Sequence, residues 1–169
     1  MTSPNKIVLG ASGYIGYRLF TAWGVEQAVG THKATPCDGS VYFDPSQMNL
    51  RDLMPSENPF THAVILFAET KIETCKRDEA RSYALNVTST KRVLEELLTM
   101  GVKPIFVSSA HVFSGEKGNY TEQDEPDPIT VYGKQKLEVE NYLAACTNDF
   151  ATLRLNKVYG SSLGDQTLL

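Results

Sequence analysis

The stretch "KIVLGASGYIGYRLFTAW", residues 6–23, decides the fold class because it joins a short apolar strand to a helix through a glycine-rich turn. Residues 6–9 are apolar and favour a strand, whereas Ile15, Leu19 and Trp23 recur at helical spacing. A strand, a glycine turn and an amphipathic helix in immediate succession are typical of the first unit of an α/β fold.

The same alternation of strand and helix signals continues along the chain. Further strands are predicted at 27–31, 40–44, 62–68, 103–109 and 151–155, and helices at 49–54, 78–100 and 131–146. Because parallel strands need crossover helices and these crossovers are right-handed, the pattern predicts a doubly wound parallel sheet of the Rossmann type. Ligands of such folds bind at the carboxyl ends of the strands, so we expect the site there.

Composition limits the classes of function. The 169 residues are enough for one domain with a real core, and a net charge of −4 argues against a nucleic-acid partner. The longest apolar run, 63–68, is too short to cross a membrane, and the N-terminus does not resemble a signal peptide. Three widely spaced cysteines predict neither a metal site nor disulfides, and they favour a cytoplasmic location.

The turn "GASGYIG" has the chemistry of a dinucleotide site. One glycine permits a tight turn, another lets the backbone approach a pyrophosphate, and a third lets the helix pack on the strand. The helix N-terminus then offers N–H groups and partial positive charge to the phosphates. Glycines that merely shape a turn are the alternative. The predicted cofactor-binding residues here are Gly10, Ser12, Gly13, Tyr14 and Ile15.

The end of the second predicted strand indicates which dinucleotide binds. NAD sites usually carry an acid about 20 residues past the glycines, whereas this chain has Thr31, His32 and Lys33 there. Lys33 and a protonated His32 would attract a 2′-phosphate, so we expect NADP to be preferred and NAD to remain an alternative. The alternative is that His32 and Lys33 are ordinary solvated loop residues with no role in cofactor choice. Asp44 would accept a bond from the adenine amino group, or would cap the turn before Ser46.

Tyr132 and Lys136 lie four residues apart in the predicted helix 131–146, so their side chains share a face. A tyrosine with a pKa near 10 is a poor acid–base group at neutral pH, and a neighbouring cation lowers that pKa. Ser109 ends the fifth predicted strand, where a hydroxyl would hold a substrate carbonyl. An ordinary amphipathic helix is the alternative, because the spacing alone is a weak signal.

These motifs together resemble the extended short-chain dehydrogenase/reductase family. The resemblance is carried by "GASGYIG", "LFAETKIETCKRDEARSYALNV", "FVSSAHVFSG", "PDPITVYGKQKLEVE" and "LRLNKVYG", which occur in family order over nearly the whole chain. Within the family the chain is most similar to the dTDP-4-dehydrorhamnose reductases, which reduce keto groups on nucleotide sugars.

The resemblance assigns roles to individual residues. It implies that Tyr132 donates the proton, that Lys136 is its partner, and that Ser109 polarises the carbonyl while a hydride moves from the nicotinamide. It places further residues along the cofactor: Phe67, Ala68, Glu69, Asn86 and Ser108, with Tyr132 and Lys136. Asn86 alternatively stabilises its own helix.

Three features depart from the family pattern. Glu69 stands where a small residue is common, which would crowd or recharge the cofactor groove, and His111 replaces a residue that is often tyrosine. His111 would touch substrate or shape its loop. Relatives also continue into a substrate-binding lobe. We therefore expect residues 1–169 to form a single NAD(P)-binding domain, with a core over 1–160, and 161–169 to begin a lobe that is largely missing.

Two functions remain open from the sequence. The first is a reductase, or its cofactor domain, that acts on a keto substrate such as a nucleotide sugar. The second is a non-catalytic dinucleotide-binding module, as in the regulatory β subunit of methionine adenosyltransferase, which is similar to this family. The resemblance also allows a homodimer through apolar helix faces, although the same residues would serve as core: Leu94, Leu97, Leu98, Val139, Tyr142 and Leu143.

Overall fold

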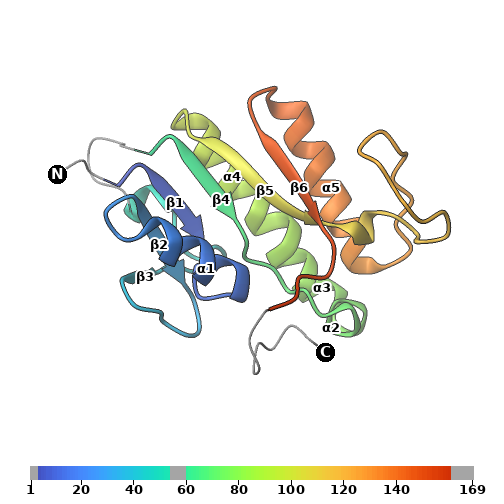
Figure 1. The fold of residues 1–169 in the computed structure, drawn as a ribbon, viewed down its shortest axis with the longest axis horizontal. Helices are drawn as coiled ribbons and strands as arrows, with labels where there is room; N and C mark the ends of the chain where they lie inside the picture. The colour runs from blue at the N-terminus through green and yellow to red at the C-terminus, as the bar shows by residue number, and fades with distance from the viewer. Residues whose placement is uncertain (1–3, 54–59, 161–169) are drawn as a thin grey trace.

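The computed structural model describes residues 4–53 and 60–160, and these form one six-stranded parallel sheet in the order β3-β2-β1-β4-β5-β6 (Figure 1). The strands are β1 (Lys6–Leu9), β2 (Ala28–His32), β3 (Ser40–Tyr42), β4 (His62–Ile65), β5 (Lys103–Ser109) and β6 (Ala151–Leu155). The strand order reverses between β1 and β4, which is the switch point of a doubly wound fold. The predicted Rossmann-type fold is confirmed.

Helices cover both faces of the sheet, with α1 on one face and α4 and α5 on the other (Figure 1). The helices are α1 (Tyr14–Trp23), α2 (Ile72–Arg77), α3 (Glu79–Tyr83), the π-helical turn η2 (Ala84–Ser89), α4 (Thr90–Thr99) and α5 (Val131–Cys146). Two short 3₁₀ turns are η1 (Leu50–Leu53) and η3 (Ala110–Val112). None of the helices in the described ranges is long and apolar enough to span a membrane.

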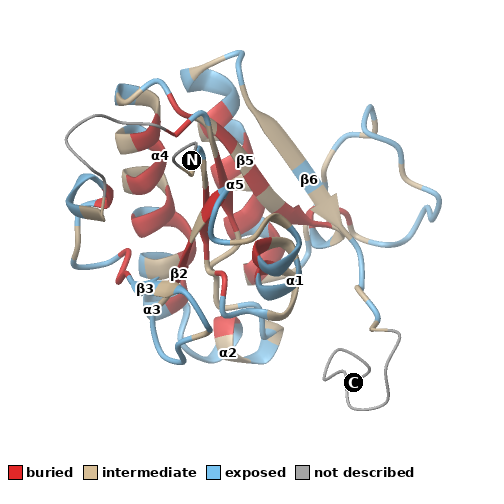
Figure 2. Ribbon diagram, turned by 60° about the vertical axis from the view of Figure 1, so that its left-hand side comes forward, coloured by how far each residue is buried: buried red, intermediate tan, exposed pale blue. Residues whose placement is uncertain are grey.

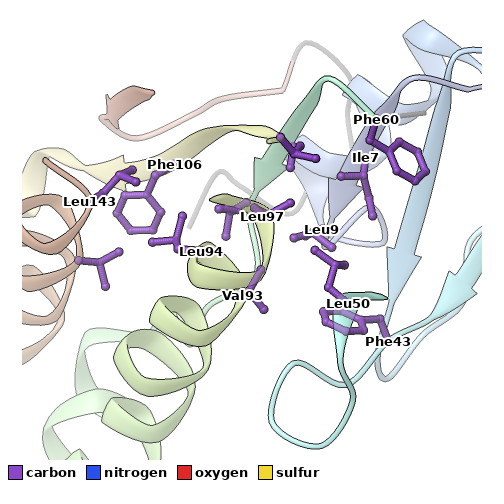
Figure 3. Close-up of a cluster of buried hydrophobic side chains, with 14 of the residues drawn as sticks. Ile7, Leu9, Phe43, Leu50, Phe60, Val93, Leu94, Leu97, Phe106 and Leu143 are labelled. Atoms are coloured by element: carbon purple, nitrogen blue, oxygen red, sulfur yellow. The ribbon is translucent and has the colours of Figure 1, made fainter. Parts of the chain in front are cut away.

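The main core lies between the sheet and the helices α4 and α5 (Figure 3). Successive strand residues point to opposite faces, so Ile7 and Leu9 join this core whereas Val8 packs against α1. Figure 2 colours buried residues red, and they are concentrated on β5 and on the inner sides of α4 and α5. The α1 face has a smaller cluster, centred on Phe20.

The predicted helix 78–100 starts where expected, a π-helical turn divides it into α3 and α4, and α2 before it was not predicted. Asp78 leaves the helical conformation at φ −134° and its carboxylate accepts a bond from the Arg81 N–H, so it ends α2 and caps α3. The π-helical turn follows, and the hydroxyls of Ser89 and Thr90 donate to main-chain carbonyls five residues earlier. The residues buried on α3 and the π-helical turn are mostly polar (Ser82, Asn86, Val87 and Ser89), so apolar spacing does not mark the turn in the sequence.

The apolar residues suggested for a dimer interface mostly belong to the core of this chain. Leu94, Leu97, Val139 and Leu143 are fully buried against the sheet. They pack as helix faces on their own sheet, which was the alternative interpretation. The homodimer itself stays a prediction. The residues 161–169, assigned from the sequence to the start of a further lobe, lie outside the described ranges.

Candidate active site

The glycine turn lies at the carboxyl end of β1. Gly10 has φ of 96°, a conformation that residues with side chains disfavour. A Cβ on Gly16 would lie 2.2 Å from the Gly10 carbonyl oxygen, so glycine is needed for α1 to pack on the turn. No side chain caps α1 at Gly13, and Ser12 is exposed beside it. The turn therefore presents a helix N-terminus that suits an anionic group.

Thr31 supports this turn from the neighbouring strand. It is buried near the end of β2, and its hydroxyl accepts a bond of 3.0 Å from the Gly10 N–H. Its hydroxyl thus stabilises the turn, a role that the sequence did not indicate. Tyr14 and Ile15 open α1 and are half-buried.

The residues predicted to select the dinucleotide have partners within the chain. The ammonium of Lys33 lies 2.9 Å from Oδ1 of Asp44, and His32 Nδ1 lies 2.7 Å from the Ser40 hydroxyl. Burial raises the pKa of Asp44, but bonds from Ser46 and Lys33 outweigh it and hold the pKa below its usual value. Asp44 therefore stays ionised beside a lysine that is half exposed, and it also caps the turn at Ser46.

The segment after β4 lies against the glycine turn. A Cβ on Gly10 would lie 3.0 Å from the Phe67 nitrogen, so the two loops touch. Phe67, Ala68 and Glu69 are half-buried. The Glu69 carboxylate accepts a bond from the Lys71 N–H at 2.9 Å, so it folds onto its own loop. Asn86 bonds both the N–H and the carbonyl of Glu69, at 2.8 and 2.9 Å.

The three predicted catalytic residues come together at the carboxyl end of β5. Ser109 ends that strand, and Tyr132 and Lys136 occupy the first turns of α5. All three are buried. The Lys136 ammonium donates to the Val107 carbonyl at 2.9 Å and lies 5.7 Å from the centre of the Tyr132 ring.

The start of α5 is held by contacts that set the place of Tyr132. Thr130 caps the helix by accepting from the Gly133 N–H at 3.0 Å. A Cβ on Gly133 would lie 2.0 Å from the His111 carbonyl oxygen, so the helix sits directly on η3. The His111 ring meets the Tyr132 ring edge-on, with centres 6.0 Å apart. His111 is thus both a loop residue and a neighbour of the candidate proton donor.

Burial controls the ionisation of this pair. It raises the pKa of Tyr132 to about 12, although the Ser109 hydroxyl acts in the opposite direction. It lowers the pKa of Lys136 to about 8, against the opposing charge of Glu140. The expectation that Lys136 lowers the pKa of Tyr132 is therefore wrong for this arrangement. The physical reason is that the desolvation of Tyr132 dominates while the ammonium is bonded to Val107.

Two buried polar residues, Ser108 and Gln135, lie close to the candidate site. The Ser108 hydroxyl, predicted near the cofactor, is buried without a hydrogen-bond partner among the described residues. Gln135, which lies between Tyr132 and Lys136 on α5, was not predicted from the sequence. It is 3% exposed and forms hydrogen bonds with Ser82 and Asn86. No sequence pattern marks a buried glutamine, whereas the cap at Thr130 follows from a known helix-start signal.

Within residues 4–53 and 60–160, no group of three or more histidine, cysteine, aspartate or glutamate side chains is arranged to hold a metal ion. All three cysteines are free thiols. The charged and polar groups of the candidate site are therefore those of the glycine turn, the β4 loop, the end of β5 and α5.

Comparison with known proteins decides the family. The model of the RmlD substrate binding domain matches residues 5–167. The chain belongs to that family. The predicted resemblance to the extended short-chain dehydrogenase/reductases, and to the dTDP-4-dehydrorhamnose reductases among them, is thereby confirmed.

Relatives within and around this family carry different names. Methionine adenosyltransferase 2 subunit beta of Bos taurus is 28% identical over 93% of this chain. The dTDP-4-dehydrorhamnose reductase of Mycobacterium tuberculosis is 26% identical over 96% of it. A solved structure, MoeE5 in complex with UDP-glucose and NAD, is 27% identical over 92% of the chain with a TM-score of 0.82.

The chain spans about half the length of these proteins: 48% of the bovine subunit, 53% of the mycobacterial reductase and 55% of MoeE5. What this chain shares with MoeE5 is thus the fold of the six-stranded sheet and its covering helices.

Proposed function

We propose that this chain is the cofactor-binding half of an NADP-preferring reductase that acts on the keto group of a nucleotide sugar such as dTDP-4-dehydrorhamnose. One observation carries the proposal. Ser109, Tyr132 and Lys136 meet at the carboxyl edge of the sheet, and the β4 loop joins them to the glycine turn through Asn86. The glycine turn and the candidate acid–base group thus lie at the same edge of the sheet.

The residues present fit a nicotinamide dinucleotide. The uncapped start of α1 and the close approach at Gly10 and Gly16 suit a pyrophosphate. Lys33, half exposed at the end of β2, would meet a 2′-phosphate by exchanging its bond to Asp44. When bound, the nicotinamide supplies the hydride.

The side chains of this chain would handle the carbonyl oxygen and its proton. The Ser109 hydroxyl would donate to the oxygen and hold it near the phenol. Tyr132, protonated because its pKa lies near 12, would give its proton to that oxygen as the alcohol forms. Lys136 would turn from the Val107 carbonyl toward the phenolate or a ribose hydroxyl, and its charge would then stabilise the phenolate.

The relatives support this reading at a coarse level. Several are named reductases of a nucleotide sugar, and MoeE5 holds UDP-glucose with NAD. The similarity to an adenosyltransferase subunit favours the second function, a dinucleotide-binding module without turnover. In that case the same groove would bind the cofactor while Tyr132 and Ser109 would have no substrate.

Titration of the purified chain with NADPH and NADH, followed by nicotinamide fluorescence, tests the shared part of both functions. We expect NADPH to bind at least about tenfold more tightly, equivalent to roughly 1.4 kcal/mol. Lys33→Ala should remove most of that preference. Lys103→Ala is the matched control. Lys103 is also a lysine in an ion pair, but it lies at the amino end of β5, away from the carboxyl ends of the strands.

Failure of both nucleotides to bind would contradict the proposal, as would a preference that survives in Lys33→Ala. Turnover separates the two functions. Reduction of a 4-keto nucleotide sugar by the full-length protein that contains this domain, lost in Tyr132→Phe with cofactor binding retained, would support the reductase. Tight cofactor binding with no turnover of such sugars would favour the binding module.

A further inference from the structure

A buried chain of amides and hydroxyls connects the candidate catalytic helix to the cofactor loop. Gln135 is next to Lys136 on α5, and its Nε2 donates to the Ser82 hydroxyl on α3 at 2.9 Å. Its Oε1 accepts from Asn86 Nδ2 on the π-helical turn at 2.8 Å. Ser82, Asn86 and Gln135 are at most 3% exposed.

The orientation of each amide in this chain follows from the main chain. Asn86 Oδ1 accepts from the Glu69 N–H, so its Nδ2 must face the Glu69 carbonyl and Gln135. The two hydrogens of Nδ2 are then both used, and Gln135 must present its oxygen to Asn86 and its amino group to Ser82. Only one arrangement satisfies every group, which makes the connection specific.

The two ends of this connection are the two halves of the candidate site. Glu69 follows β4 in the loop that touches the glycine turn. At the other end, Tyr132 and Lys136 lie three residues before and one residue after Gln135 on α5. Because neighbouring helix positions differ by about 100°, fixing the Gln135 side chain also fixes which way Lys136 and Tyr132 point.

We infer that Gln135 is a positioning residue that holds the Tyr132–Lys136 pair in register with the cofactor loop, through Asn86 and Glu69. The inference rests on the proposed function for its consequence, but the coupling is a property of the protein without any ligand. Loss of the amide leaves an N–H of Asn86 buried with only the Cys75 sulfur, 3.9 Å away, as a weak acceptor. The position of the Glu69 loop then no longer depends on the rotation of α5 about its axis.

Nuclear magnetic resonance of the ligand-free chain tests the coupling with Gln135→Leu, which keeps the volume and removes both hydrogen bonds. We expect the Glu69 amide to exchange with solvent at least about tenfold faster than in the wild type, equivalent to roughly 1.4 kcal/mol, after normalisation to the core amide of Val8. We also expect the Cε signal of Lys136 to move and its titration midpoint to rise, because α5 turns and the ammonium regains water. Lys134→Gln, an exposed neighbour on the same helix, should change neither signal.

Ser82→Ala is a milder variant in case Gln135→Leu does not fold. It removes the outer bond of Gln135 and leaves the bond to Asn86, so both signals should move in the same direction by a smaller amount. The inference is overturned if Glu69 and Lys136 respond no more than they do in Lys134→Gln, or if Lys136 responds without Glu69. These readouts need no cofactor, so a chain that fails to bind NADPH but shows the coupling would refute the proposed function alone.

Discussion

At the scale of single residues, the site is governed by burial more than by pairing. The sequence located Ser109, Tyr132 and Lys136 correctly at one edge of the sheet, because helix spacing and strand ends are readable from residue patterns. It could not predict their ionisation, since the desolvation of Tyr132 and the bond from Lys136 to Val107 depend on tertiary packing. The same holds for Gln135, whose partners lie about 50 residues away.

The depressed pKa of Lys136 predicts a specific pH dependence of stability. Below pH 8 the lysine is charged in both states and its burial costs stability in full. Between about 8 and 10.5 the unfolded chain binds more protons, so the stability of the wild type should rise with pH. The fall from 10.5 to about 8 corresponds to roughly 3 kcal/mol at about 1.4 kcal/mol per pKa unit.

Lys136→Met removes that charge and isolates its contribution. We expect the free energy of unfolding of the variant to exceed that of the wild type at pH 7, with a difference that shrinks between pH 8 and 10. Above pH 10 the raised pKa of Tyr132 acts in the opposite direction in both proteins and cancels from the difference. Urea unfolding at a series of pH values measures this, with Lys134→Met as control. A difference that does not vary with pH would show that Lys136 titrates normally.

At the scale of elements, the contacts that shape the site are made where helices begin and break. The sequence predicted α5 at its observed bounds, Val131–Cys146, and the structure adds the cap at Thr130. It did not predict α2 before Asp78 or the π-helical turn, which directs the Asn86 side chain to Glu69 and Gln135. Breaks of this kind are decided by the partners they reach, here Glu69 and Gln135.

Gly133→Ala tests how closely α5 must approach η3. The added Cβ would meet the backbone oxygen of His111 at 2.0 Å, and neither backbone can yield without moving the helix. We expect a loss of about 1–3 kcal/mol in the free energy of unfolding, the range for overpacking, and weaker nicotinamide binding as Tyr132 shifts. Urea unfolding and fluorescence titration measure the two effects. Lys134→Ala, one residue later and exposed, should be nearly neutral, and an equally neutral Gly133→Ala would mean that α5 is not held by this contact.

At the scale of the whole molecule, the two faces of the sheet are covered unequally. The fold class and strand order follow from the alternation of elements and from the handedness of crossovers, so the sequence predicted them. How far each face is covered could not be read in this way. Phe106 of β5 faces α4 and α5 and is 1% exposed. Leu153 of β6, paired in register with Val107 on the other face, is 45% exposed.

This asymmetry predicts that equal truncations on the two faces have unequal costs. Phe106→Ala opens a cavity inside the main core and should reduce the free energy of unfolding by about 3–5 kcal/mol. Leu153→Ala removes a side chain that keeps nearly half of its surface in water, so it should cost less than about 1 kcal/mol. Urea unfolding of the 169-residue chain measures both, and both variants should keep the same dependence on denaturant as the wild type. A cost for Leu153→Ala comparable with that for Phe106→Ala would mean that β6 is covered on its second face in solution, and the uneven layering described for this sheet would be wrong.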